Sequence, residues 1–124
     1  MKYVAQPVTL ARGRTCPDIA FDLDRIGEDG LQGWVVRAGA NMDDFNAYVV
    51  VTDSRGFRRA YYAPLYTRMD VADQRGDPRA ANSGFKIVFP KNEFAPGSYA
   101  VHMALQSRQT GEVLESAQKW TAGR

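Results

Sequence analysis

Apolar and polar side chains alternate most clearly in residues 84–107, where two short runs flank a turn. In the first run, large apolar residues recur at every second position: Phe85, Ile87 and Phe89. In the second run they do the same: Tyr99, Val101, Met103 and Leu105. A period of two is typical of a half-buried strand in an antiparallel sheet. Pro96-Gly97 between the runs favours a tight turn, so the stretch predicts two paired strands.

Similar runs occur earlier in the chain. They predict strands in residues 19–24, 31–38, 47–52 and 57–63, with turns rich in glycine and aspartate between several of them. After a tight turn, residues 112–120 combine a helix-forming composition with the length and position of a hairpin partner. We interpret this last run as a strand, with a short helix as the alternative.

Seven or eight short strands predict an all-β fold, an antiparallel immunoglobulin-like β-sandwich. We place the sandwich domain in residues 18–124 and expect residues 1–17 to form an N-terminal edge strand or a linker. Residues 64–83 are the longest irregular region, with a short helical turn expected around residues 70–74. Irregular segments of this length are often functional.

The same alternation predicts the hydrophobic core. Each core candidate lies on the apolar side of a predicted strand, and Trp34 is the expected anchor of its own strand. We expect these residues to be largely buried: Trp34, Val49, Val51, Phe85, Ile87, Phe89, Tyr99, Val101, Met103 and Leu105.

Composition narrows the class of protein. At 124 residues the chain can bury a core without disulfides, and its single cysteine cannot form an internal one. The net charge of +2 and the dispersed basic residues argue against nucleic-acid binding. No apolar run approaches the length of a membrane-spanning helix, and the N-terminus lacks the apolar centre of a signal peptide. We therefore expect a cytoplasmic protein that does not insert into membranes.

Catalytic chemistry has few candidates here. The only histidine, His102, lies on the less apolar face of its predicted strand, and Cys16 lies in a predicted loop far away in sequence. Nucleophilic catalysis needs a base within hydrogen-bond reach of the nucleophile, and one Cys with one His cannot build a usual zinc site. We interpret the pair as a surface histidine and an incidental thiol, and expect neither enzymatic activity nor a cofactor.

Two acidic loops offer oxygen ligands of the kind that calcium binds. The first contains Asn41, Asp43, Asp44 and Asn46, and the second Asp70, Asp73 and Asp77. Neither has the spacing of an EF-hand. In the first, local bonds from side chain to backbone are the favoured interpretation. In the second, neighbouring arginines predict surface ion pairs.

Tyrosine and arginine gather between residues 57 and 68, in the strand that ends at residue 63 and the loop that follows. Tyrosine rings stack on sugars, arginine provides forked donors, and both are typical of protein-binding hot spots. Tyr62 shares its strand face with Arg58 and Ala60, so it is expected to be more exposed than Tyr61. The candidate ligand-binding residues are Arg58, Arg59, Tyr61, Tyr62, Tyr66 and Arg68.

Residues 94–101 resemble the entry to the penultimate strand of fibronectin type III and other immunoglobulin-like domains. In those domains a proline-glycine turn precedes a tyrosine whose hydroxyl ties the strand to the preceding loop. The resemblance implies this role for Tyr99.

A longer resemblance rests on four short segments in order: Gly33-Trp34, Arg68-Met69-Asp70-Val71, Ser83-Gly84-Phe85 and Pro96-Gly97-Ser98-Tyr99. They are similar to small β-sandwich accessory domains found beside bacterial glycosyltransferases and methyltransferases of surface-polysaccharide assembly. The resemblance implies a non-catalytic binding module, accessory to bacterial surface-glycan assembly. The alternative is a protein–protein interaction or assembly domain with no carbohydrate ligand.

Overall fold

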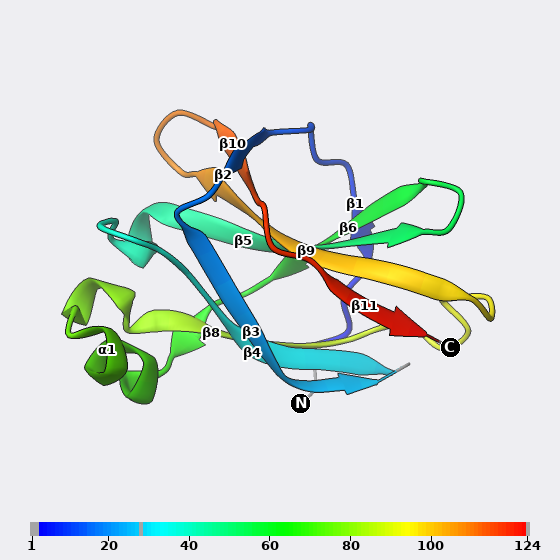
Figure 1. Ribbon diagram of the computed structural model, residues 1–124, viewed down its shortest axis with the longest axis horizontal. Helices are drawn as coiled ribbons and strands as arrows, with labels where there is room; N and C mark the ends of the chain where they lie inside the picture. The colour runs from blue at the N-terminus through cyan, green and yellow to red at the C-terminus, as the bar shows by residue number, and fades with distance from the viewer. Residues whose placement is uncertain (1–2, 28, 124) are drawn as a thin grey trace.

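The computed structural model describes residues 3–27 and 29–123 as two β-sheets packed face to face (Figure 1). The larger sheet, with β5 and β9 at its centre, lies above the smaller sheet of β3, β4 and β8 in this view. A short helix, α1 (Met69–Arg75), lies at the left end. Within the described residues no helix is long and apolar enough to cross a lipid bilayer.

The two sheets have simple strand orders. The larger follows β1-β6-β5-β9-β10-β2, with β11 also paired to β9, and the smaller follows β3-β4-β8-β7. The strand bounds are β1 Pro7–Val8, β2 Arg14–Cys16, β3 Ile19–Gly27, β4 Gly30–Arg37, β5 Phe45–Asp53, β6 Arg58–Ala63, β7 Tyr66–Thr67, β8 Asn82–Val88, β9 Ser98–Ser107, β10 Val113–Ser116 and β11 Trp120–Gly123.

The structure is mostly β, as predicted, although it also contains α1 and two short 3-10 turns. The described residues contain more strands than the seven or eight expected, because several are only two to four residues long. Pairing is antiparallel throughout the strand pairs except between β2 and β10, which run parallel. The expected strand at residues 112–120 is present but divided. β10 ends at Ser116, and β11 begins at Trp120. The two strands pair with different parts of β9, β10 with residues 104–106 and β11 with residues 98–101.

The core lies between the sheets, where strand pairing brings apolar residues into register, such as Val49 opposite Met103. The core prediction is confirmed for Val49, Val51, Phe85, Ile87, Phe89, Val101, Met103 and Leu105. Trp34 and Tyr99 are only partly buried, and both pack against the core from its margin.

The N-terminal segment packs on both sheets, and we call residues 3–16 the arm. Its first residues hydrogen-bond to Val88 of the smaller sheet, and β1 then pairs with the edge strand β6 of the larger sheet. The arm, dark blue in Figure 1, continues to β2, which pairs with β10 at the opposite edge. Between these strands Leu10 packs on the outer face of the larger sheet, against a small cluster of buried residues: Val50, Ala60, Ala104 and Val113.

The region of residues 64–83 is more ordered than a loop. It contains β7, α1 and a short 3-10 turn, η2 (Pro78–Ala80). A second 3-10 turn, η1 (Met42–Asp44), lies before β5. The expected helical turn is confirmed as α1. It ends at Gly76, whose left-handed backbone (φ 61°) lets its N–H bond to the carbonyls of Ala72 and Asp73. The region therefore places side chains at fixed positions beside the smaller sheet.

Candidate functional site

The six predicted binding residues do not form one surface. Strand alternation separates neighbours in β6, because successive side chains point to opposite faces. Arg58 and Tyr62 lie on the outer face of the larger sheet, Arg59 and Tyr61 on the inner side of the same strand, and Tyr66 and Arg68 beside the smaller sheet.

Tyr61 belongs to the core. Its side chain is fully buried and its hydroxyl donates a hydrogen bond of 2.6 Å to Oε2 of Glu93. Burial is the main cause that raises the pKa of Tyr61, and the hydrogen bond to Glu93 raises it further. Arg59 lies beside it and donates to the backbone oxygen of Glu93 at 2.7 Å. These two residues fix the loop before β9, and Tyr61 presents no surface to a ligand.

Tyr62 is more exposed than Tyr61, as predicted from its strand face, but its side chain is still half-buried. Its ring centroid lies 5.7 Å from that of Tyr48 and 6.5 Å from that of Tyr3. Tyr62 therefore helps to hold the arm against the larger sheet.

Tyr66 and Arg68 lie on the outer face of the smaller sheet. In the strand register Trp34 of β4 stands opposite Gly84 of β8, and Gly84 stands opposite Tyr66 of β7. A Cβ on Gly84 would lie 2.5 Å from Cγ of Arg68 and 2.7 Å from the Tyr66 ring. Both side chains therefore lie directly over this glycine, in the same row as Trp34.

Arg68 crosses this face and is held at both ends. Its Nη1 donates to Oδ2 of Asp24, in the edge strand β3, at 2.6 Å. Its Nε and Nη2 form a forked pair with the carboxylate of Asp70, at 2.9 and 2.7 Å. The hydrogen bonds from Arg68 lower the pKa of Asp70 to about 2. The guanidinium is thus fixed in one position before any ligand arrives.

Next to this row the outer face is hollowed. A shallow depression of about 620 Å³ runs along β3, β4 and β8 and is lined by polar side chains that include Asp24, Arg25, Gln32 and Lys86. In the register Arg25 stands opposite Gln32, and Gln32 opposite Lys86. We call Asp24, Gln32, Trp34, Tyr66, Arg68 and Lys86 the outer-face site.

Trp34 packs against the core cluster but is only partly buried, so it is not the core anchor that was expected. Leu31, Gly33 and Val35 are buried on the core side of β4, so Trp34, between them, belongs to the other face. The Arg75 guanidinium of α1 lies 5.1 Å from the centroid of its ring, in cation–π geometry. The alternation of Leu31, Gly33 and Val35 was the sequence signal that could have placed it outward.

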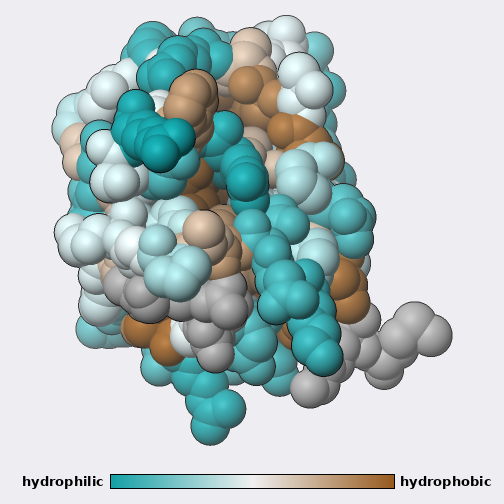
Figure 2. Space-filling model, turned by 90° about the vertical axis from the view of Figure 1, so that its right-hand side faces the viewer, coloured by the Kyte–Doolittle hydropathy of each residue, from teal (hydrophilic) through white to brown (hydrophobic). Residues whose placement is uncertain are grey.

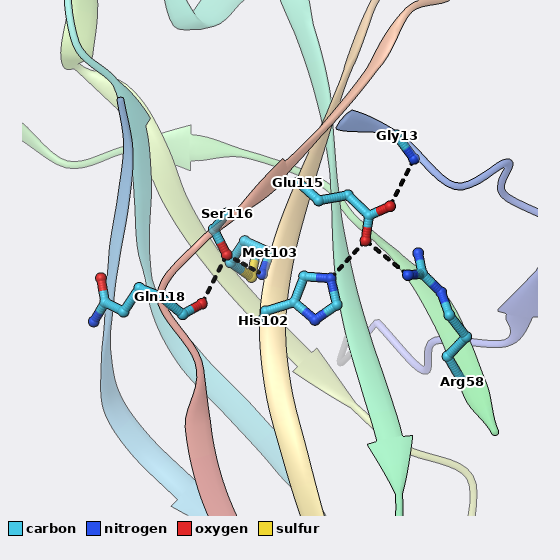
Figure 3. Close-up of polar contacts among 7 residues, drawn as sticks. All are labelled: Gly13, Arg58, His102, Met103, Glu115, Ser116 and Gln118. Atoms are coloured by element: carbon cyan, nitrogen blue, oxygen red, sulfur yellow. Dashed lines mark hydrogen bonds and ion pairs between the residues drawn. The ribbon is translucent and has the colours of Figure 1, made fainter. Parts of the chain in front are cut away.

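His102 is not a surface histidine, which corrects a second expectation. The arm covers its face of the larger sheet, and the side chain is only 6% exposed. Its Nε2 lies 2.7 Å from Oε1 of Glu115, which also pairs with Nη1 of Arg58 at 2.8 Å (Figure 3). The second oxygen of Glu115 accepts the backbone N–H of Gly13, in the arm, at 2.6 Å. One carboxylate therefore joins three segments.

The electrostatics of this cluster favour an ionised Glu115 beside a neutral His102. Burial lowers the pKa of His102, and its bond to Glu115 offsets this only in part. Burial alone would raise the pKa of Glu115, but hydrogen bonds from Arg58, His102 and Gly13 outweigh it and lower that pKa. Nδ1 of His102 and Nη2 of Arg58 are buried without a hydrogen-bond partner in the described structure. The cluster fastens the arm to the sheet.

Cys16 is likewise not in a loop. It is the last residue of β2 and is 3% exposed. It is buried because β2 pairs with β10, a long-range contact that no local sequence pattern predicts.

The acidic loops behave as local turns. Oδ1 of Asn41 accepts the N–H of Asp43, which caps η1, and Asp77 accepts the N–H of Arg79 while pairing with its guanidinium at 3.0 Å. Both favoured interpretations are thereby confirmed. Over the described part of the chain, no group of three or more His, Cys, Asp or Glu side chains is placed to hold a metal ion.

Comparisons with protein families, with characterised proteins and with solved structures returned no match for this chain. The outer-face site is therefore interpreted from its own geometry.

Proposed function

We propose that this chain is a non-catalytic binding module that recognises a glycan through the outer-face site. The row formed by Trp34, Gly84 and Tyr66 carries the proposal. The missing side chain of Gly84 gives Tyr66 and Arg68 room beside Trp34. Aromatic rings provide apolar surfaces for the C–H faces of sugars, and Tyr66 is 39% exposed.

The polar half of the site suits sugar hydroxyls. Gln32 and Lys86 are neighbours in register, and they offer an amide and an ammonium group beside the aromatic row. Arg68 is held by Asp24 and Asp70, so little conformational entropy is lost when a ligand contacts it. Mixed acidic and basic groups along the depression provide both donors and acceptors.

An immunoglobulin-like arrangement is part of the proposal. The order β3-β4-β8-β7 corresponds to strands A, B, E and D of that fold, and β6-β5-β9-β10 corresponds to C′, C, F and G. The bond from the Tyr99 hydroxyl to the Ala95 carbonyl, at the start of β9, is the expected position of a tyrosine corner. Both observations support the arrangement.

The accessory role in bacterial surface-glycan assembly rests on the resemblance of the four short segments described above. Three of them contribute directly to the outer-face site, through Trp34, Arg68 and Gly84. Three of the four segments that carry the resemblance thus lie in or beside the proposed binding surface.

A glycan array with bacterial surface oligosaccharides tests the proposal. The wild type should bind a defined subset, and Tyr66→Ala and Lys86→Ala should each weaken that binding about tenfold, the effect of losing one well-placed contact. Phe57→Ala is the matched control, because Phe57 is 69% exposed just before β6, away from the smaller sheet, and should bind normally. Binding to no glycan, together with capture of a protein partner that Tyr66→Ala abolishes, would favour the protein-interaction alternative.

A further inference from the structure

A second hollow lies between the two sheets, at the end of the sandwich opposite α1. Its volume is about 260 Å³, and its walls come from the end of the β3–β4 hairpin, from β9 and β11, and from the segment after β8. Figure 2 views this end of the molecule and shows brown, apolar side chains between hydrophilic ones. We call it the inter-sheet cleft, and its main side chains are Ile26, Leu31, Phe89, Phe94, Tyr99 and Trp120.

Few polar groups line the cleft, and several of them already make hydrogen bonds within the protein. The Tyr99 hydroxyl already donates to the Ala95 carbonyl. Thr121 also lines the cleft, but in the register it stands opposite Ala100, on the other face of β9 from Tyr99, so strand alternation places its side chain on the outer face. The backbone of β11 is paired with β9 along Trp120 to Gly123. A sugar would leave most of its hydroxyls without partners here, which costs free energy for each one.

The walls of the cleft continue an aromatic series that begins in the core. Tyr61 and Phe89 have ring centroids 4.9 Å apart, Phe89 and Phe94 4.8 Å, and Phe94 and Tyr99 5.3 Å. All three contacts are edge-to-face, the geometry that aromatic rings prefer. A planar ring in the cleft would meet the end of this series and extend it.

We infer that the inter-sheet cleft binds a small planar aromatic molecule of one or two fused rings. The volume sets the size, since an apolar cavity of about 150 Å³ is large enough for benzene. The cleft exceeds that volume and therefore has room for a second fused ring. Trp120 is one of the lining residues, and its indole N–H is a donor suited to a ligand that bears one acceptor atom. This inference does not depend on the outer-face site.

Indole and quinoline are suitable probes, because both have two fused rings and only quinoline carries an acceptor nitrogen. Each would be titrated into the ¹⁵N-labelled protein while amide shifts are followed by NMR. We expect saturable shifts confined to residues around the cleft, with quinoline binding more tightly. Decalin, which has two fused saturated rings and no π system, should bind at least about tenfold more weakly. Equal affinity for decalin would overturn the aromatic assignment.

Two variants that fill the cleft test its location. Ala122→Leu places a larger side chain on the β11 wall, and Ile26→Phe does so from β3, where Ile26 is 43% exposed and the core is not disturbed. Each should lower the affinity for quinoline at least about tenfold. Ala100→Leu, on the opposite face of β9, is the matched control and should bind as the wild type does. Unchanged quinoline affinity in both filling variants, with normal melting temperatures, would overturn the site. Glycan binding should persist in Ala122→Leu, the variant that separates the two sites, because Ile26 also lines the depression on the outer face and Ala122 does not.

Discussion

The hydroxyl of Tyr99 donates a hydrogen bond to the backbone carbonyl of Ala95, four residues earlier in the chain. This bond closes the turn that contains Pro96 and Gly97 and fixes the point at which β9 begins. The Tyr99 ring also lies 5.3 Å from the ring of Phe94, so the same residue ties the turn to the core. The start of the central strand thus depends on one side chain.

Tyr99→Phe should lower the free energy of unfolding by about 1 kcal/mol, because it removes this hydrogen bond and keeps the ring. Urea denaturation measures the change as a lower midpoint with an unchanged slope. Tyr66→Phe, at a partly exposed position on the other sheet, is the control and should leave the midpoint nearly unchanged. A midpoint equal to that of the wild type in Tyr99→Phe would mean that the bond adds nothing to stability.

Phe89→Ala tests the register of β8 and the segment after it. Phe89 is 6% exposed and makes edge-to-face contacts with Tyr61 and Phe94. Its truncation should cost about 3–5 kcal/mol, through lost burial and the cavity that remains. Phe57→Ala, at a largely exposed site, should change stability by less than about 0.5 kcal/mol. A loss below about 1 kcal/mol in Phe89→Ala would contradict the packing described here.

Most of the fold could be predicted from local patterns. The alternation around Tyr99 and Val101 predicted the face of β9 that meets the core, and the resemblance of residues 94–101 to immunoglobulin-like domains implied the role of the Tyr99 hydroxyl. These features depend on residues close together in sequence. Strand pairing then follows from matching the apolar faces.

The features that could not be predicted depend on segments far apart in sequence. His102 is buried because the arm lies over it, and the Gly13–Glu115 bond that holds the arm there spans 102 residues. Cys16, the last residue of the arm, is buried because β2 pairs with β10. The outer-face site also depends on contacts between segments that are far apart in sequence. Trp34 and Tyr66 are brought into one row only by their shared neighbour, Gly84.

Stability should fall as the pH drops below about 6.5, because His102 is buried in its neutral form. Its folded-state pKa is below the ordinary value of 6.5, so the unfolded chain takes up the proton more readily. The stabilisation is therefore complete above pH 6.5 and is lost as the pH falls towards the folded-state pKa. Arg58 and Lys119 oppose the new charge, and Glu115 favours it.

Urea midpoints between pH 8 and pH 5 measure this dependence. The range stays above the titration of Glu115, whose lowered pKa affects stability only at more acidic pH. His102→Gln keeps a donor for Glu115 and cannot titrate, so its midpoint should vary less over the same range. Parallel curves for the two proteins would show that another group causes the pH dependence.

Gly13→Ala should loosen the arm. A Cβ at this position would overlap the backbone oxygen of Val113, and backbone cannot move aside cheaply. Overpacking of this kind costs about 1–3 kcal/mol, so the reactivity of the buried Cys16 thiol should rise about tenfold or more. A thiol reagent measures the rate. Ala11→Ser, at an exposed arm position, should react like the wild type. An unchanged rate in Gly13→Ala would show that the arm does not protect Cys16.

Gly84→Ala should weaken glycan binding while the chain still folds. The new methyl group would lie within 2.8 Å of the Tyr66 ring and 2.5 Å from Cγ of Arg68, so these two side chains must move off the sheet. The backbone at Gly84 is not left-handed, and Tyr66 can rotate towards solvent. Arg68 can move only by weakening its ion pairs with Asp24 and Asp70, so the expected loss of stability is about 1–3 kcal/mol. Affinity for the glycan selected on the array should fall about tenfold, as in Tyr66→Ala. Because both changes remove the contact of the Tyr66 ring, the double variant should lose less affinity than the sum of the two single losses. Additive losses would show that Gly84 and Tyr66 act independently, and wild-type affinity in Gly84→Ala would remove the row of Trp34, Gly84 and Tyr66 as the binding surface.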